Sequence, residues 1–180
     1  LLEKAIPKST DSIFHLAAVV SAGAEEDFDL GMSVNLDATR NILEICRGNN
    51  TRPKVIFASS CAGFGGYMPE VIEDMTARTP QTSYGTQKVI GELLVNDYTR
   101  KGFIDGRALR FPTVVVRPGK PNKAASTFAS SIIREPLQGE KAVCPVDPNS
   151  KMFLASPRSI IQNVVHAHNL TADDWGFSRE

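Results

Sequence analysis

Three long apolar runs, separated by segments with helical spacing, dominate the hydrophobic pattern of this chain. The runs cover residues 12–18, 54–60 and 108–116, and the last is interrupted at Pro112. Strands that are buried on both faces are continuously apolar, whereas a strand with one wet face alternates apolar and polar residues. The runs therefore predict parallel strands in an α/β protein, with helices covering both faces of the sheet.

The segments around these runs predict helices and one long loop. Apolar residues recur at helical spacing over residues 29–47, from Thr79-Pro80 onward, over residues 126–138 and after Ser156-Pro157. Thr79 is expected to cap the second helix with Pro80 at its first position, because proline fits the first helical turn. Residues 61–79 predict a loop and residues 142–144 a short strand.

Composition and charge narrow the class of protein. The chain has 180 residues, enough for one domain with a sizeable core, and 20 basic residues balance 20 acidic ones. Without a basic stripe or a long apolar span, nucleic-acid binding and membrane insertion are not expected. The cysteines, Cys46, Cys61 and Cys144, are odd in number and widely spaced. They favour a reducing, cytoplasmic location and argue against a disulfide framework or a metal site.

Tyr84 and Lys88 carry the most specific chemistry in the sequence. Their spacing of four residues places a phenol and an ammonium on one face of a helix. A phenol titrates near ~10 and is a poor base at neutral pH, but a neighbouring cation favours the phenolate. Many surface helices carry such a pair by chance, so a catalytic role needs support from the rest of the sequence.

Small or polar residues stand at the end of the first two apolar runs and just after the interruption of the third at Pro112. They are Ala17-Ala18, Ser59-Ser60 and Thr113. Open parallel sheets bind ligands beyond the carboxyl ends of their strands, so these residues are well placed to form a site. His15, on the first run, is expected to be a structural histidine satisfied by a hydrogen bond.

Four short motifs stand in order along the chain. They are His15-Leu-Ala-Ala18, Asn35-Leu-Asp-Ala-Thr39, Phe57-Ala-Ser-Ser60 and Tyr84-Gly-Thr-Gln-Lys88. Together they resemble the extended short-chain dehydrogenase/reductase family, which contains sugar-nucleotide epimerases and dehydratases. One such match is weak, whereas four in register over residues 12–119 are specific. The resemblance implies a Rossmann-like doubly wound parallel sheet and NAD as the cofactor.

The resemblance also implies roles for individual residues. Tyr84 would be the general acid/base, Lys88 would lower the pKa of Tyr84 and bind the nicotinamide ribose, and Ser60 would hold the reacting oxygen. The implied cofactor-binding residues are Leu16, Ala17, Ala18, Asn35, Ser60, Tyr84, Lys88 and Pro112. The implied substrate contacts are Cys61, Thr113, Lys120 and Arg158.

Within the family, residues 110–122 resemble the D-erythronate dehydrogenases, which oxidise a four-carbon sugar acid. The resemblance predicts an NAD-dependent oxidoreductase that oxidises a secondary hydroxyl of a small sugar acid. Arg158, Lys120 and Arg117 are candidates to hold the carboxylate of such a substrate. A homodimer is expected, because family members commonly associate through the helix with the Tyr-x-x-x-Lys pair and the helix before it.

Two alternatives stay open. The first is a sugar-nucleotide epimerase or dehydratase that retains its NAD. Phe64 and Thr113 weaken it, because they replace a tyrosine and an asparagine of the family pattern. The second is a truncated, non-catalytic nucleotide-binding or interaction protein.

The family's Gly-rich dinucleotide fingerprint is missing ahead of residue 12. Residues 1–180 are therefore expected to be a partial dinucleotide-binding domain, incomplete at the N-terminus, with a core over residues 12–119. Residues 120–180 would run into the substrate-binding part. The chain alone is expected to bind NAD poorly and to fold marginally.

Overall fold

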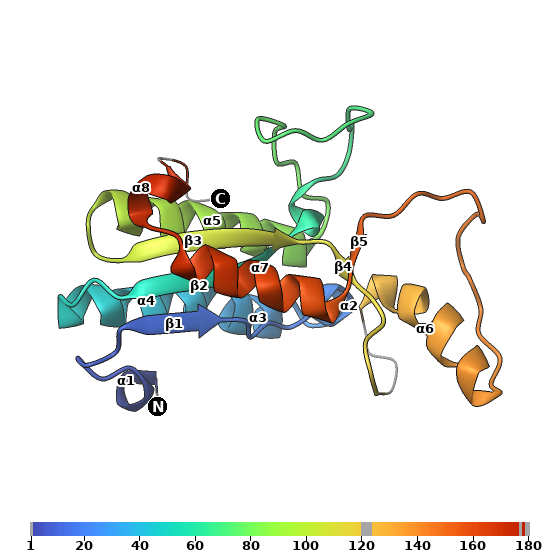
Figure 1. The fold of residues 1–180 in the computed structure, drawn as a ribbon, viewed down its shortest axis with the longest axis horizontal. Helices are drawn as coiled ribbons and strands as arrows, with labels where there is room; N and C mark the ends of the chain where they lie inside the picture. The colour runs from blue at the N-terminus through green and yellow to red at the C-terminus, as the bar shows by residue number, and fades with distance from the viewer. Residues whose placement is uncertain (1, 120–123, 177, 179–180) are drawn as a thin grey trace.

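The structure, a computed structural model, describes residues 2–119, 124–176 and 178. Its centre is a parallel sheet of three strands in the order β1-β2-β3 (Figure 1). The strands are β1 (Ser12–His15), β2 (Lys54–Ser60) and β3 (Asp105–Phe111). The register pairs His15 with Phe57 and Ser60 with Phe111, so the chain leaves all three strands at the same edge of the sheet.

Helices cover both faces of this sheet. One face carries α4 (Ala38–Asn49) and α5 (Ser83–Arg100), and the other carries α7 (Pro157–Asn169) (Figure 1). Successive residues of β2 point to opposite faces: Val55 and Phe57 join the core with α4 and α5, whereas Ile56 joins the core with α7. The predicted Rossmann-like, doubly wound parallel sheet is confirmed, with β2 buried on both sides.

Shorter elements complete the described chain. They are α1 (Leu2–Ala5), α2 (Ser21–Glu26), α3 (Phe28–Gly31), the π-helix η1 (Met32–Asp37), the 3₁₀ turns η2 (Cys61–Gly63), η3 (Ala125–Thr127) and η4 (Pro136–Gln138), the strands β4 (Thr113–Val114) and β5 (Leu154–Ala155), and the helices α6 (Phe128–Arg134) and α8 (Ala172–Trp175). The prediction of a strand at residues 142–144 is wrong, because these residues form no strand in the structure. β4 pairs instead with β5, where the amide of Thr113 donates to the carbonyl of Phe153 at 3.1 Å.

The predicted start of α5 is also corrected. Thr82, not Thr79, is the N-cap, and its hydroxyl accepts from the Gly85 amide at 3.0 Å. The Thr79 hydroxyl donates to the Gly65 carbonyl at 2.6 Å and so holds the preceding loop together. Either threonine could cap the helix by its place in the sequence. In the structure Thr82 caps it, whereas Thr79 binds the loop at Gly65.

The predicted helix over residues 29–47 forms, but with an irregular middle. α3 leads into the π-helix η1, which leads into α4. A π-helix widens the turn and is common at functional sites. Here it contains the buried Asn35.

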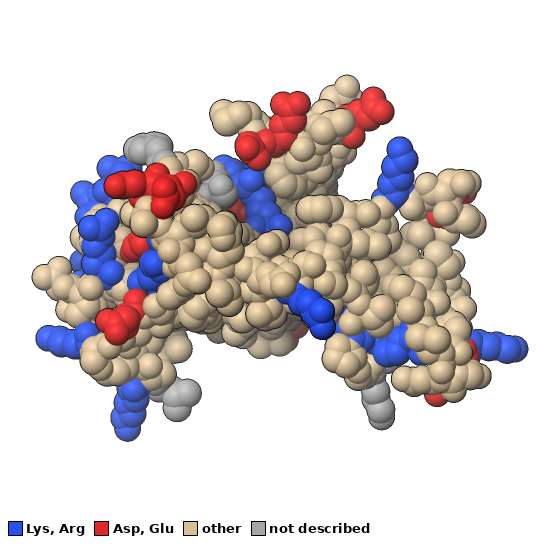
Figure 2. Space-filling model, viewed as in Figure 1, with Lys and Arg blue, Asp and Glu red and all other residues tan. Residues whose placement is uncertain are grey.

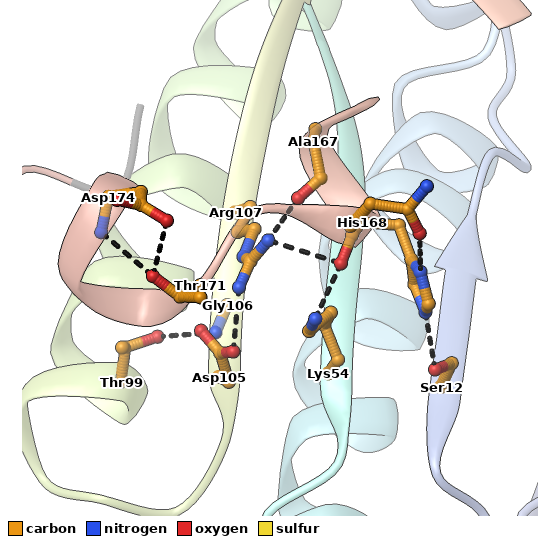
Figure 3. Close-up of polar contacts among 11 residues, drawn as sticks. Ser12, Lys54, Thr99, Asp105, Gly106, Arg107, Ala167, His168, Thr171 and Asp174 are labelled. Atoms are coloured by element: carbon orange, nitrogen blue, oxygen red, sulfur yellow. Dashed lines mark hydrogen bonds and ion pairs between the residues drawn. The ribbon is translucent and has the colours of Figure 1, made fainter. Parts of the chain in front are cut away.

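A cluster of polar contacts fastens the end of α7 to the sheet (Figure 3). The fully buried guanidinium of Arg107, on β3, donates to the carbonyls of Ala167 and His168 and pairs with Asp105 at 2.9 Å. From β2, the Lys54 ammonium donates to the same His168 carbonyl at 2.5 Å. Cations suit the carbonyl end of a helix, where the dipole is negative.

Charged side chains gather near α1 and α8 on the face shown in Figure 2, whereas the area over α7 is largely free of them. Two exposed side chains of α7, Ile161 and Val165, are apolar. None of the described helices is long and apolar enough to cross a membrane.

Candidate functional site

A cleft of about 510 Å³ lies where the chain leaves the carboxyl ends of β1, β2 and β3. This is the edge at which parallel sheets hold ligands. Its walls come from the loop after β1, the end of β2 with η2, the first turns of α5, and the chain that follows β3. The predicted site residues that line it are Leu16, Ala18, Ser60, Cys61, Tyr84, Lys88, Pro112 and Thr113.

Close packing brings Tyr84 to Ser60. The Ser60 hydroxyl accepts from the Ala62 amide at 3.1 Å, which fixes the turn after β2. The first turn of α5 lies against this turn so closely that a Cβ on Gly85 would be 2.2 Å from the Ala62 carbonyl oxygen. The absence of a side chain at Gly85 is therefore what allows the phenol of Tyr84 and the hydroxyl of Ser60 to share the cleft.

Lys88 reaches the cleft from the next turn of α5. Its side chain is 2% exposed, and its ammonium donates to the Ala58 carbonyl at 2.7 Å. The ammonium also lies 4.9 Å from the centre of the Phe57 ring and 5.7 Å from that of Tyr84. Burial lowers the pKa of Lys88 to about 8, and the nearby charge of Glu92 opposes this. The lysine is thus a partly desolvated cation close to its titration range.

The predicted lowering of the Tyr84 pKa by Lys88 stays a prediction. The pKa of Tyr84 is raised, first because burial disfavours the phenolate, whereas interaction with the Ser60 side chain lowers it. The ammonium of Lys88 donates to the Ala58 carbonyl and lies over the Tyr84 ring, 5.7 Å from its centre. Burial therefore favours the protonated phenol of Tyr84.

Asn35 lies behind the cleft and holds its wall. It accepts from the Val19 amide at 2.8 Å and donates to the Val19 carbonyl at 3.0 Å and to the Gln87 side chain at 2.7 Å. The loop after β1 is thereby tied to the turn of α5 between Tyr84 and Lys88. Asn35, predicted as a cofactor-binding residue, is not among the cleft-lining residues, and in this structure it supports the wall of the cleft. Gln87, the partner, carried no signal in the sequence beyond its place beside Lys88.

His15 is held away from the cleft as a buried neutral group. Its Nε2 atom lies 2.8 Å from the Thr39 hydroxyl, which itself donates to the Asn35 carbonyl at 2.7 Å. Because the hydroxyl has only one proton to give, Nε2 of His15 must be the donor. Burial, and then the charge of Lys88, lower the pKa of His15 to about 4.

The remaining predicted residues are distributed differently. Ala17 is exposed beside the cleft and is not one of its lining residues. Arg158 is exposed on the first turn of α7, outside the cleft, and Lys120 lies outside the described residues. Arg117, in contrast, lines the cleft, with its side chain 3.3 Å from the Thr127 hydroxyl. Phe64 faces elsewhere, since its ring lies 5.5 Å from the guanidinium of Arg110.

The donor set suits the nicotinamide end of a dinucleotide. Lys88 and Tyr84 offer donors for ribose hydroxyls, Pro112 offers an apolar wall, and Ala18 leaves the backbone after β1 accessible. Among the described residues, no group of three or more His, Cys, Asp or Glu side chains could hold a metal ion.

The chain is similar to known proteins of one family. The profile of the NAD dependent epimerase/dehydratase family matches residues 1–152. The chain is 59% identical over 169 residues to D-erythronate dehydrogenase of Haemophilus influenzae, covering 94% of this chain and 54% of that protein. It is 56% identical over 179 residues to D-erythronate dehydrogenase of Cupriavidus necator, covering 99% of this chain and 55% of that protein. The chain thus spans about half the length of these relatives.

A solved structure shares the fold closely. It is described as a nucleoside-diphosphate-sugar epimerase from Agrobacterium tumefaciens, and it superposes with a TM-score of 0.93 at 48% identity. The superposition covers 99% of this chain and 54% of that chain.

Proposed function

Because the chain belongs to the NAD-dependent epimerase/dehydratase family, we propose that the protein is an NAD-dependent dehydrogenase that oxidises a secondary hydroxyl of a small sugar acid. The observation that carries the proposal is the meeting of Ser60, Tyr84 and Lys88 with Arg117 in one cleft at the carboxyl ends of the strands. The identity to D-erythronate dehydrogenases supports the choice of a four-carbon acid such as D-erythronate.

Each of these side chains has a chemical task in that reaction. Tyr84, as phenolate, accepts the proton of the substrate hydroxyl, and Ser60 donates a hydrogen bond to the reacting oxygen. Lys88 holds a positive charge beside the phenol and binds the nicotinamide ribose. Bound NAD supplies the hydride acceptor, while the protein supplies position and field. Since burial raises the pKa of Tyr84, loss of its proton needs the charge of Lys88 in the loaded site.

Arg117 is our choice to hold the substrate carboxylate. A guanidinium matches a carboxylate with two parallel hydrogen bonds, which a lysine cannot do. Arg117 lines the same cleft as Tyr84, and its backbone is fixed by contacts from Ser130 and Arg134. Arg158, the other described candidate, is exposed outside the cleft.

A sugar-nucleotide epimerase is the second candidate, because the similar Agrobacterium tumefaciens structure bears that description. Such an enzyme retains its NAD and releases no net NADH. The two differences of this chain from the family pattern favour the dehydrogenase. Phe64 cannot donate a phenolic hydrogen bond and faces Arg110, and Thr113 takes the place of an asparagine in the cleft.

We further propose that the protein is cytoplasmic and forms a homodimer through α4 and α5. The three free cysteines support a reducing compartment. Leu93, on α5, is an exposed apolar side chain of the proposed interface helix.

The function is tested by following NADH formation by the full-length protein with D-erythronate, related sugar acids, the matching neutral sugar alcohols and UDP-sugars. We expect NADH with a sugar acid and little with its neutral analogue. Tyr84→Phe is expected to lower kcat by at least ~100-fold, because the general base is lost, with the Kd for NAD within ~2-fold.

Each of three results would contradict the proposal. NADH formation by Tyr84→Phe at the wild-type rate would remove Tyr84 from the reaction. Conversion of a UDP-sugar with tightly retained NAD and no free NADH would favour the epimerase. Failure of every substrate to react, with or without retained NAD, would favour a non-catalytic nucleotide-binding or interaction protein.

A further inference from the structure

We propose that Glu92 is a positioning residue of this site, which holds the serine end of β2 against α5 and places a negative charge next to the Lys88 ammonium. The proposal rests on the proposed function for its catalytic consequence. The carboxylate is 1% exposed and is one helical turn beyond Lys88, on the same face of α5. A fully buried carboxylate is costly unless it is paired, so its partners reveal what it organises.

The partners of Glu92 come from three other segments. From β2, the Ser59 hydroxyl donates to Oε1 of the carboxylate. From β3, Arg110 makes a two-pronged contact, with Nη2 at 2.9 Å and Nε at 3.1 and 3.2 Å from the two oxygens. From the loop before α5, Nη1 of Arg78 lies 3.7 Å from Oε2. One carboxylate thus joins β2, β3, α5 and that loop.

These contacts act on the residues that line the cleft. Ser59 and Arg110 are register partners in the sheet, and Ser59 immediately precedes Ser60. Holding Ser59 against α5 fixes the end of β2, where Ser59 and Ser60 both line the cleft. Arg110 in turn lies 5.5 Å from the ring of Phe64, which follows η2. The turn that carries Ser60 is therefore held at both of its ends.

The charge of Glu92 also acts on Lys88. From β2, the Ala58 carbonyl and the Phe57 ring contact the ammonium, and neither carries a net charge. β1 contributes the neutral His15 and α5 contributes the Tyr84 ring, while Cys61 of η2 lines the same cleft. Burial raises the pKa of both Tyr84 and Cys61, which favours their uncharged forms. Among these groups Glu92 is the one that favours the charged lysine. Arg110 and Arg78 face the carboxylate and moderate its effect.

The test follows the titration of Lys88 by NMR in full-length protein with isotope-labelled lysine, the signal being assigned by its loss in Lys88→Met. In the wild type we expect a midpoint near the pKa of about 8. Glu92→Gln keeps the shape of the side chain and removes its charge, and it should move the midpoint down by at least ~0.5 pH unit. Glu92→Asp keeps the charge and should recover most of that shift. If Glu92→Gln does not fold, Glu92→Asp alone should give a small downward shift.

The matched control is Asp97→Asn, which removes one negative charge from the same helix at an exposed ion pair with Arg100. It should leave the Lys88 midpoint unchanged. In the dehydrogenase assay, Glu92→Gln should lower kcat by about tenfold with KM within ~2-fold, because substrate contacts are kept.

The outcomes separate the two proposals. An unchanged Lys88 midpoint in Glu92→Gln overturns the role of Glu92, even if the variant loses activity or unfolds at a lower temperature. Absence of NADH formation by the wild type contradicts the proposed function, whereas the lysine titration still decides whether Glu92 acts on Lys88.

Discussion

At the scale of single residues, the buried groups behind the cleft make the fold sensitive to pH. His15 is 7% exposed, and the pKa of its ring is lowered from 6.5 to about 4, by burial first and by Lys88 second. The unfolded chain therefore binds a proton at His15 at a higher pH than the folded chain does. Stability from this group is present above the unfolded pKa of 6.5 and is lost as the pH falls through about 4.

We therefore predict a pH-dependent effect of His15→Gln. Between neutral pH and pH 4, the free energy of unfolding of the wild type should fall by about 3 kcal/mol more than that of the variant. Urea denaturation across the pH series measures this difference. The control His166→Gln alters an exposed histidine of α7 and should keep the wild-type slope. Parallel curves for His15→Gln and the wild type would show that His15 is not the group that titrates.

Candidate site residues could be predicted from the sequence where they belong to short motifs. The sequence motifs of Ser60, Tyr84 and Lys88 predicted a shared site, and all three residues line the cleft. They meet because the cleft forms where the strand ends face the first turns of α5. Arg158 could not be placed in this way, since a single arginine has no periodicity to show which way it faces. The burial of Glu92 could not be predicted from the sequence either. Its partners Ser59, Arg78 and Arg110 are distant in the chain and meet it only in the folded structure.

At the scale of elements, the attachment of α7 decides whether the second face of the sheet is covered. Arg107 is fully buried, and in Figure 3 it points at the carbonyl end of α7, where it donates to Ala167 and His168. The ring of Trp175, in α8, lies 5.6 Å from its guanidinium. Removing one member of a buried ionic cluster leaves the others desolvated and unpaired.

Arg107→Met should accordingly lower the free energy of unfolding by about 3 kcal/mol, because Asp105 and two helix carbonyls lose their partner. Urea denaturation at neutral pH measures this change. Arg100→Met offers the matched comparison, since Arg100 is exposed in an ion pair with Asp97 and its removal should change stability little. Equal effects of the two variants would mean that the cluster at the end of α7 is not a stabilising contact.

The boundaries of elements were harder to predict than their existence. β3 begins at Asp105, three residues before the apolar run that predicted it, because Arg107 is buried by its ion pair and not by apolar character. The π-helix η1 has the same residue types as an α-helix, so its wider backbone turn cannot be predicted from the sequence. Its buried Asn35 contacts Val19 and Gln87, which lie far from it in the chain.

At the scale of the whole molecule, the arrangement of layers follows from the apolar runs. A strand that is apolar on both sides needs a covering layer on each face of the sheet. For β2, α4 and α5 form one layer and α7 forms the other (Figure 1). The coverage of both faces by helices could therefore be anticipated from the sequence, whereas the order of the strands comes from the structure. What binds to the outer faces of the helices cannot be predicted in this way. An exposed apolar residue is common on any protein surface and does not by itself identify a partner.

Two exposed apolar side chains on opposite sides of the sheet allow the proposed dimer to be tested. Leu93 of α5 is 52% exposed and Ile161 of α7 is 57% exposed. A lysine at a dimer interface places a charge in an apolar contact, which costs free energy unless it is paired. Leu93→Lys should therefore raise the dimer dissociation constant of the full-length protein at least ~tenfold by analytical ultracentrifugation. Ile161→Lys introduces the same charge on the other face and should leave it unchanged. Dissociation by Ile161→Lys alone would move the interface to α7 and its apolar surface.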